Sequence, residues 1–155
     1  MGLTDAERHA IEWECAQNIV RFYNRLDGVR GEEAAALFAE DGKWFREGDE
    51  SAYTGRAEIA HHVNTLPARG NTGIAPELKM VFHLVNNVEV TVLDAETAEV
   101  RALTAIVSGA RSTTPGEAGT TKGISSILRT LEVHKKTNAG WKIATKRTQR
   151  ELRVA

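Results

Sequence analysis

The sequence predicts an α+β fold in which helices cover one face of a strongly curved, mostly antiparallel sheet. Apolar residues recur at helical spacing up to about residue 66, whereas a period of two dominates from about residue 79. The later segments follow one another through short turns, which is typical of an antiparallel meander that comes after a helical region. Because a strongly twisted sheet with helices on one face can curl, we expect a half-open cone.

Three helices are expected in the first part of the chain. The first begins at Thr4, which forms a capping-box pattern with Glu7, and ends at Gly28. Its apolar residues cover a wide arc, as expected of a helix that lies across a sheet. A second helix is predicted over about 31–39 and a third over about 56–66.

Short strands are predicted over 43–45 and near 51–53, the first of them after a turn at Asp41-Gly42. Four longer strands are predicted over about 79–93, 98–109, 124–136 and 141–152. The Ser-, Thr- and Gly-rich segment 111–123 is interpreted as a loop between two of them.

The strand over 79–93 carries an irregular apolar pattern. Its valines and its histidine fall into two sets of opposite parity, which are Val81, His83 and Val85, then Val88, Val90 and Val92. One extra residue at Asn86-Asn87, a β-bulge, would bring both sets onto one face and bend the strand.

Composition sets the broad class of the protein. With 155 residues, the chain 1–155 is expected to be a single domain with a sizeable core. A formal net charge of -1 gives no reason to expect nucleic acid or an anionic membrane as a partner. Cys15 is the only cysteine, so neither an internal disulfide nor a thiolate metal site is possible. The polar N-terminus and the lack of a long apolar run predict a cytoplasmic protein.

Asp27 and His83 are the candidate catalytic pair. Asp27 lies in the last turn of the first helix and continues an apolar stripe, while His83 is the one ionisable residue of the segment 80–85. A histidine among apolar neighbours needs a polar partner. If the two meet, the carboxylate fixes the imidazole in one tautomer and makes it a better base. Singly, Asp27 is also interpretable as a turn residue and His83 as a structural histidine.

Other residues are candidates for the same site. Arg129 or Arg147 would stabilise a developing anion if one of them entered the mouth of the pocket, the alternative being a rim arginine. Tyr23, Trp44 and Tyr53 are either ligand donors or core aromatics. Ile59, Val63, Val85 and Ile127 are expected to form pocket walls. No motif for a metal, a nucleotide or a flavin is present, so we expect no cofactor.

Several segments resemble SnoaL-like proteins of the NTF2-like superfamily. They are Phe22–Asp27, Leu37–Trp44, Thr54–Ile59, His83 followed four residues later by Asn87, and Gly140–Ile143. The resemblance spans nearly the whole chain and implies a cone-shaped α+β domain with a deep pocket, usually a homodimer. Phe22 and Asn87 are candidate ligand contacts on this ground.

The superfamily's enzymes include polyketide cyclases, scytalone dehydratase, bile acid dehydratase and hexachlorocyclohexane dehydrochlorinase. In the last three, an Asp and a His act together in an elimination without a cofactor, and the matching positions here are Asp27 and His83. Several of the dehydratases carry a tyrosine five residues before the Asp, where this chain has Phe22. Tyr23 is adjacent but would point about 100° away on the helix.

These observations predict a cofactor-independent lyase or isomerase that acts on a small, apolar, cyclic molecule. In that hypothesis His83 takes a proton, Asp27 balances the imidazolium, and an arginine or Asn87 stabilises the anion. Two alternatives use the same fold, a non-catalytic protein that binds a small molecule and a dimerisation module. A polar pair inside an apolar pocket favours the first two over the third.

Overall fold

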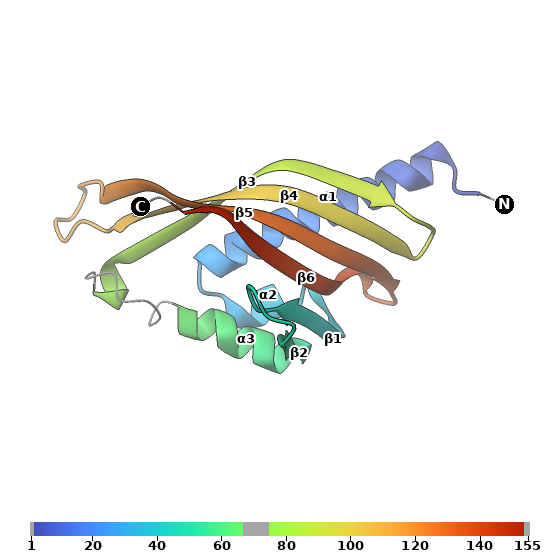
Figure 1. Cartoon of the computed structure of the whole chain (residues 1–155), viewed down its shortest axis with the longest axis horizontal. Helices are drawn as coiled ribbons and strands as arrows, with labels where there is room; N and C mark the ends of the chain where they lie inside the picture. Colours follow the sequence, from blue (N-terminus) through green and yellow to red (C-terminus); the bar gives the residue numbers. More distant parts are fainter. Residues whose placement is uncertain (1, 67–74, 154–155) are drawn as a thin grey trace.

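The computed structural model describes residues 2–66 and 75–153, which form helices packed on one curved sheet (Figure 1). The helices are α1 (Asp5–Asp27), α2 (Gly31–Ala35) and α3 (Gly55–Thr65), and a 3₁₀ turn, η2, covers Pro76–Leu78. The strands are β1 (Phe38–Phe45), β2 (Ala52–Thr54), β3 (Lys79–Val92), β4 (Thr97–Ala110), β5 (Thr120–Thr137) and β6 (Gly140–Arg153).

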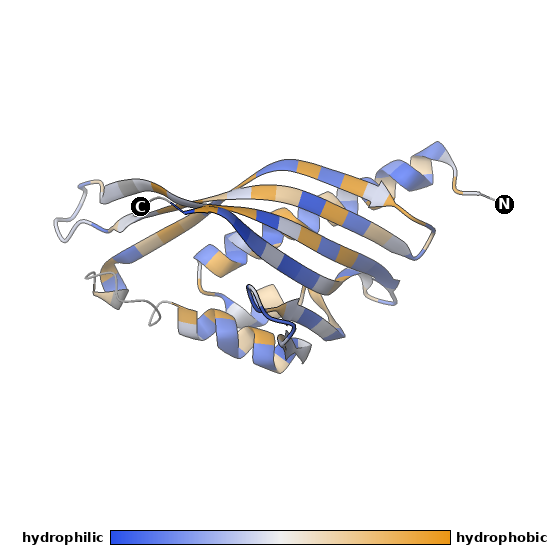
Figure 2. Ribbon diagram, viewed as in Figure 1, coloured by the Kyte–Doolittle hydropathy of each residue, from blue (hydrophilic) through white to orange (hydrophobic). Residues whose placement is uncertain are grey.

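The described strands form one six-stranded sheet in the order β2-β1-β6-β5-β4-β3. Only the β1–β6 pair is parallel, so the predicted mostly antiparallel sheet is confirmed. Hydrophobic and hydrophilic residues alternate along much of β3 and β4, whereas most of β6 is hydrophilic (Figure 2). Helix α1 lies along the buried face of the sheet and contacts β3, β4 and β6.

The ends of α1 follow the sequence prediction. The Thr4 side chain accepts a hydrogen bond from the backbone of Glu7, and the Glu7 carboxylate accepts one from the backbone of Thr4. Gly28 caps the other end. The side chains of Ile11, Cys15, Ile19, Phe22 and Leu26 are buried against the sheet, so this helix is held by its apolar arc.

Two local predictions were wrong. The second helix ends at Ala35 instead of near residue 39, and Phe38 already belongs to β1. The Asp41-Gly42 pair is not a turn but part of an irregularity within β1, where the register with β6 shifts between Phe38 and Lys43. A Cβ atom at Gly42 would lie 3.0 Å from the carbonyl oxygen of Ile143, so only glycine lets the strands approach this closely.

The predicted bulge in β3 is confirmed. The register between β3 and β4 shifts between Asn86 and Glu89, and Asn87 has a positive φ of 50°. As a result Val85 and Val88 pack on the same core although they have opposite parity. The bulge bends the sheet around the end of α1, where the candidate residues lie.

Candidate active site

Asp27 and His83 come from two elements that pack on each other. Asp27 is the last residue of α1, and His83 lies in β3 on the face that the helix covers. The end of α1 therefore places the Asp27 carboxylate next to β3. The exposed fractions are 15% for the Asp27 side chain and 12% for that of His83, so the pair is largely shielded but retains an open side.

The Asp27 carboxylate accepts two hydrogen bonds from the same residue. The backbone N–H of His83 donates to Oδ2 at 2.8 Å, and the ring Nδ1 lies 2.5 Å from Oδ1. With an ionised carboxylate, this contact places the ring proton on Nδ1 and leaves the lone pair of Nε2 free. The arrangement is the one that a neutral imidazole base requires.

Tyr23 is the third member of this group. Its ring stacks on that of His83, with 4.9 Å between centroids and an interplanar angle of 26°. Tyr23, a candidate ligand contact or core aromatic in the sequence, therefore lies beside the pair. Tyr23 and Asp27 are four residues apart, and residues at this spacing share one face of a helix. Phe22 lies in the core, in edge-to-face contact with Phe38 and Trp44.

Beneath Tyr23 lies a buried charged cluster that the sequence did not suggest. Lys146 Nζ donates to Glu132 Oε1 at 2.6 Å and to the Tyr23 hydroxyl at 3.3 Å. His134 Nε2 lies 2.7 Å from the second oxygen of Glu132. Glu132, His134 and Lys146 are all fully buried. Among the described residues, His134 Nδ1 and the hydroxyl of Thr104 have no hydrogen-bonding partner.

The two charges of this cluster, on Glu132 and Lys146, stabilise each other. Burial alone would raise the pKa of Glu132, but the attraction of Lys146 and the hydrogen bond from His134 outweigh it and lower this pKa to about 2. Burial opposes the charge on Lys146 in the same way, and Glu132 raises the pKa of the ammonium above its ordinary value. At neutral pH both groups are ionised.

Arg129 and Arg147, the predicted anion-stabilising residues, lie away from the pair. Arg129 is exposed and bonds Glu151, while the guanidinium of Arg147 bonds Glu50 and stacks 3.6 Å from the ring centroid of Phe45. In their strands, both arginines alternate with the buried residues, so they lie on the opposite face of the sheet. We therefore remove them from the candidate site. Arg150, on the buried parity, bonds the carboxylate of Glu47 and the hydroxyl of the buried Ser126.

The predicted wall residues fall into two groups. Val85 packs on the core beside the pair, and Ile59 and Val63 are fully buried on α3. Asn87 is instead an exposed bulge residue, and Ile127 has the same outward parity as Arg129. The latter two therefore do not belong to the site.

Trp44 and Tyr53 form an aromatic group with His62. The Tyr53 ring stacks on that of His62 with 3.9 Å between centroids, and Trp44 meets His62 edge to face at 4.8 Å. His62 was not among the candidates named from the sequence, and it is only 9% exposed. The signal that could have identified it is its i, i+3 spacing from the core residue Ile59.

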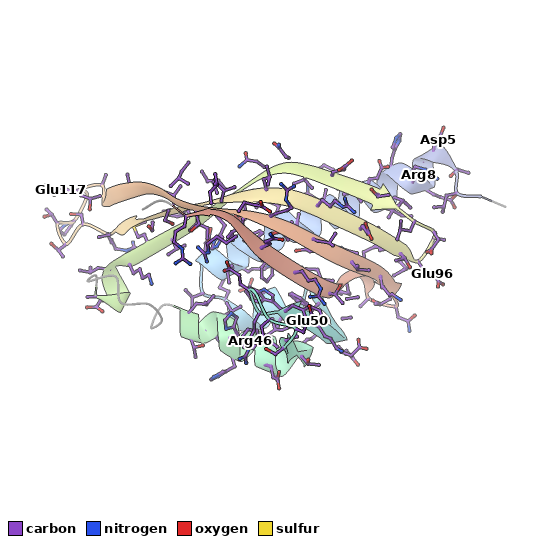
Figure 3. All side chains as sticks on the ribbon, in the orientation of Figure 1. Asp5, Arg8, Arg46, Glu50, Glu96 and Glu117 are labelled. Atoms are coloured by element: carbon purple, nitrogen blue, oxygen red, sulfur yellow. The ribbon has the colours of Figure 1, made fainter. Side chains whose placement is uncertain are left out.

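Two surface hollows are lined by described residues, and neither includes Asp27 or His83. One, of about 550 Å³, lies between the loop 46–50 and strands β5 and β6. Figure 3 labels Arg46 and Glu50 of that loop. The other, of about 490 Å³, lies between α2 and α3. Within the described ranges, no three His, Cys, Asp or Glu side chains gather as a metal site would require.

Comparisons with known proteins identify the family of the chain. The model of the SnoaL-like domain family matches residues 7–147. No curated protein matches the sequence. A structure described as that of a proposed scytalone dehydratase from Novosphingobium aromaticivorans is 16% identical, with 97% of this chain and 91% of that chain covered and a TM-score of 0.71.

Two further structures are similar over most of their length. A proposed dehydratase of the NTF2-like family from Streptomyces avermitilis is 17% identical, with coverage of 93% and 99% and a TM-score of 0.71. A Catenulispora acidiphila protein in complex with S-DNPA is 17% identical, with coverage of 92% and 95% and a TM-score of 0.70. At these identities the likeness shows the NTF2-like fold. In the part of the chain that is described, no helix has the length and apolarity needed to cross a membrane.

Proposed function

Because this chain belongs to the SnoaL-like domain family, we propose that it is a cofactor-independent lyase or isomerase that acts on a small, apolar, cyclic molecule. The observation that carries the proposal is the double hydrogen bond between the Asp27 carboxylate and His83. It leaves Nε2 of the imidazole available as the base of a largely shielded pair.

In the proposed reaction, His83 Nε2 removes a proton from a carbon atom of the substrate. Asp27 holds the ring in the required tautomer and stabilises the imidazolium that forms. The imidazolium then returns its proton to another carbon in an isomerisation, or to a departing hydroxyl in an elimination. The neighbouring Tyr23 and Val85 would contact the bound ring.

The similar structures support the class of function without naming the substrate. Two of them are described as proposed dehydratases, and one is in complex with a small molecule. A reaction that needs only proton transfer is compatible with the residues present, since a base, its orienting carboxylate and a phenol lie together.

The test is a panel of cyclic ketones, hydroxy ketones and halogenated cycloalkanes, incubated with the protein in D₂O and followed by proton NMR. His83→Ala should lose about 10²–10⁴-fold in the rate of proton exchange or product formation. Asp27→Asn should lose a similar factor, and the double variant should be little worse than either, because residues that act as a unit are not additive.

His61→Ala is the matched control, since His61 is an exposed histidine on α3. Wild-type turnover by a folded His83→Ala variant would end the proposal. Tight binding of a panel member without exchange or turnover would instead support the alternative, a protein that only binds a small molecule.

We also propose that two copies pair through the outer face of the sheet. Four of its large apolar side chains are between 46% and 64% exposed, namely Phe82, Leu84, Ile124 and Leu152. They are adjacent in the strand register, where Phe82 faces Val107 and Val107 faces Ile124. A contiguous exposed apolar patch of this kind is typical of an interface.

A further inference from the structure

The buried cluster of Glu132, His134 and Lys146 is not needed for the proton transfer proposed above. Nor is it explained by stability, because burying an ion pair costs desolvation energy that its attraction often does not recover. Well-packed apolar side chains would fill the same volume at no such cost. The position of Lys146 relative to Tyr23 indicates another role.

Lys146 presents its ammonium to Tyr23 in two ways. Nζ lies 3.3 Å from the phenol oxygen and 4.5 Å from the ring centroid. An ammonium has no lone pair, so it donates this hydrogen bond. The other neighbour of the phenol oxygen is the Thr130 hydroxyl at 2.9 Å, where either atom can donate.

When Thr130 donates as well, the phenol oxygen accepts two hydrogen bonds, and no described residue accepts the proton of the phenol. A phenol polarised by a cation is a strong donor to an oxyanion, because charge-assisted hydrogen bonds are about twice as strong as neutral ones. The hydroxyl of Thr104 is fully buried and has no partner among the described residues. Thr104 lies in β4 on the buried face of the sheet, diagonal to Thr130 of β5. A second donor therefore faces the same interior.

Glu132 fixes the cation in this place. Its carboxylate bonds Lys146 through one oxygen and His134 through the other. The ammonium cannot turn toward solvent without leaving Glu132 buried and unpaired. The positive charge next to Tyr23 is thus a permanent part of the fold, as an anion-stabilising group should be.

We infer that Lys146, held by Glu132, is a positioning residue that makes Tyr23 the donor to an oxyanion, and that the substrate is therefore a carbonyl compound. This inference rests on the proposed function. His83 takes the proton from the carbon next to the carbonyl, and the C–H electron pair moves to the carbonyl oxygen. The enolate accepts the hydrogen bond of Tyr23. It then collapses by taking the proton back at another carbon, or by expelling a hydroxyl that leaves as water with that proton.

The test uses 4-nitrophenol as a stable mimic of the enolate oxygen, since its ionised form has a distinct visible absorption. Binding is titrated at several pH values to obtain separate affinities for phenolate and phenol. The wild-type protein should prefer the phenolate. The variant Lys146→Met with Glu132→Gln, which removes both charges, should lower the ratio of the two affinities at least about tenfold, the order of one charge-assisted hydrogen bond.

Three further variants make the outcome decisive. Tyr23→Phe should lose the same preference, which keeps the inference testable if the charge-free variant does not fold. Lys135→Met removes an exposed lysine from the same strand as Glu132 and should leave the ratio unchanged. His83→Ala should keep the phenolate preference although it removes the proposed base.

An unchanged ratio in a folded Lys146→Met/Glu132→Gln variant, or no phenolate preference in the wild type, would overturn the inference. A preference that disappears in His83→Ala would assign it to the imidazole and overturn it equally. The proposed function fails separately, through the retention of turnover by His83→Ala, because the nitrophenol titration measures no proton transfer to carbon.

Discussion

Lys146 shows how one residue can reverse the interpretation of a strand. In the sequence, Trp141, Ile143, Thr145 and Arg147 alternate, which places Arg147 on the inner face and Lys146 in solvent. The structure inserts a bulge, because His134 pairs with Ile143 whereas Val133 pairs with Thr145. The parity of β6 changes at Ala144, so Lys146 is buried and Arg147 is exposed. A single extra residue in a strand leaves no mark in the hydrophobic pattern when the residues around it are polar.

The Glu132–Lys146 pair predicts an unusual pattern of stability. Lys146→Met alone should lower the free energy of unfolding by about 3–5 kcal/mol, because it leaves an uncompensated buried carboxylate. Adding Glu132→Gln should recover much of that loss, since the amide oxygen can still accept from His134. Urea unfolding measures both, and Lys135→Met should stay within about 0.5 kcal/mol of the wild type. A double variant less stable than Lys146→Met alone would contradict this account.

Cys15 should be chemically inert in the folded protein. Burial, together with the charges of Glu14 and Glu132, raises the pKa of its thiol to about 12. The reactive thiolate is therefore scarce at neutral pH, and the side chain is fully buried. A thiol-specific chromogenic reagent should react very slowly with the native protein. In urea it should label one equivalent of thiol per chain. Fast labelling in native buffer would show that α1 separates from the sheet.

At the scale of elements, regular strands could be predicted from the sequence. Irregular strands could be predicted only where the apolar pattern changes at the irregularity. The valines of β3 change parity at Asn86-Asn87, which predicted the bulge that the structure contains. In β1 no apolar residue marks the irregularity, so its Asp41-Gly42 pair was interpreted as a turn. The Asp27–His83 contact links residues 56 positions apart in the chain. The apolar surroundings of the two residues suggested the pair, and the resemblance to a family supported it.

The bulge in β3 should depend on the residue at its left-handed position. Asn87 has φ of 50°, a conformation that asparagine and glycine adopt more readily than a β-branched residue. Asn87→Gly should therefore change the unfolding free energy little, whereas Asn87→Val should lower it by about 1–2 kcal/mol. Thr91→Val, at an exposed position of the same strand, is the control. Equal stability of Asn87→Gly and Asn87→Val in urea would mean that the bulge relaxes at no cost.

For the whole molecule, the buried Glu132–Lys146 pair should make the stability fall below pH 4.5 and leave it unchanged in mild alkali. Glu132 has a folded pKa of about 2 against an ordinary value of 4.5, so its contribution is complete above pH 4.5 and is lost as the pH falls toward 2. Lys146 has a raised pKa, so its contribution persists up to its ordinary value of 10.5 and is lost only above it. Urea midpoints measured across this acid range should fall more steeply for the wild type than for the Lys146→Met/Glu132→Gln variant. Parallel curves would contradict the assignment.

The largest prediction concerns assembly, because the sheet buries only one of its faces within the chain. The outward residues Leu84 and Phe82 are 52% and 46% exposed. A stable pair of subunits buries about 800 Å² on each partner, which a sheet face of this kind can supply. Sedimentation should therefore find a dimer at micromolar concentration, and Leu84→Arg should convert it to a folded monomer, since the same patch meets itself across a two-fold axis. Trp13→Glu changes a more exposed apolar residue, on α1, and should leave the dimer intact. A wild-type monomer, or a dimer that dissociates with Trp13→Glu instead, would place the interface elsewhere.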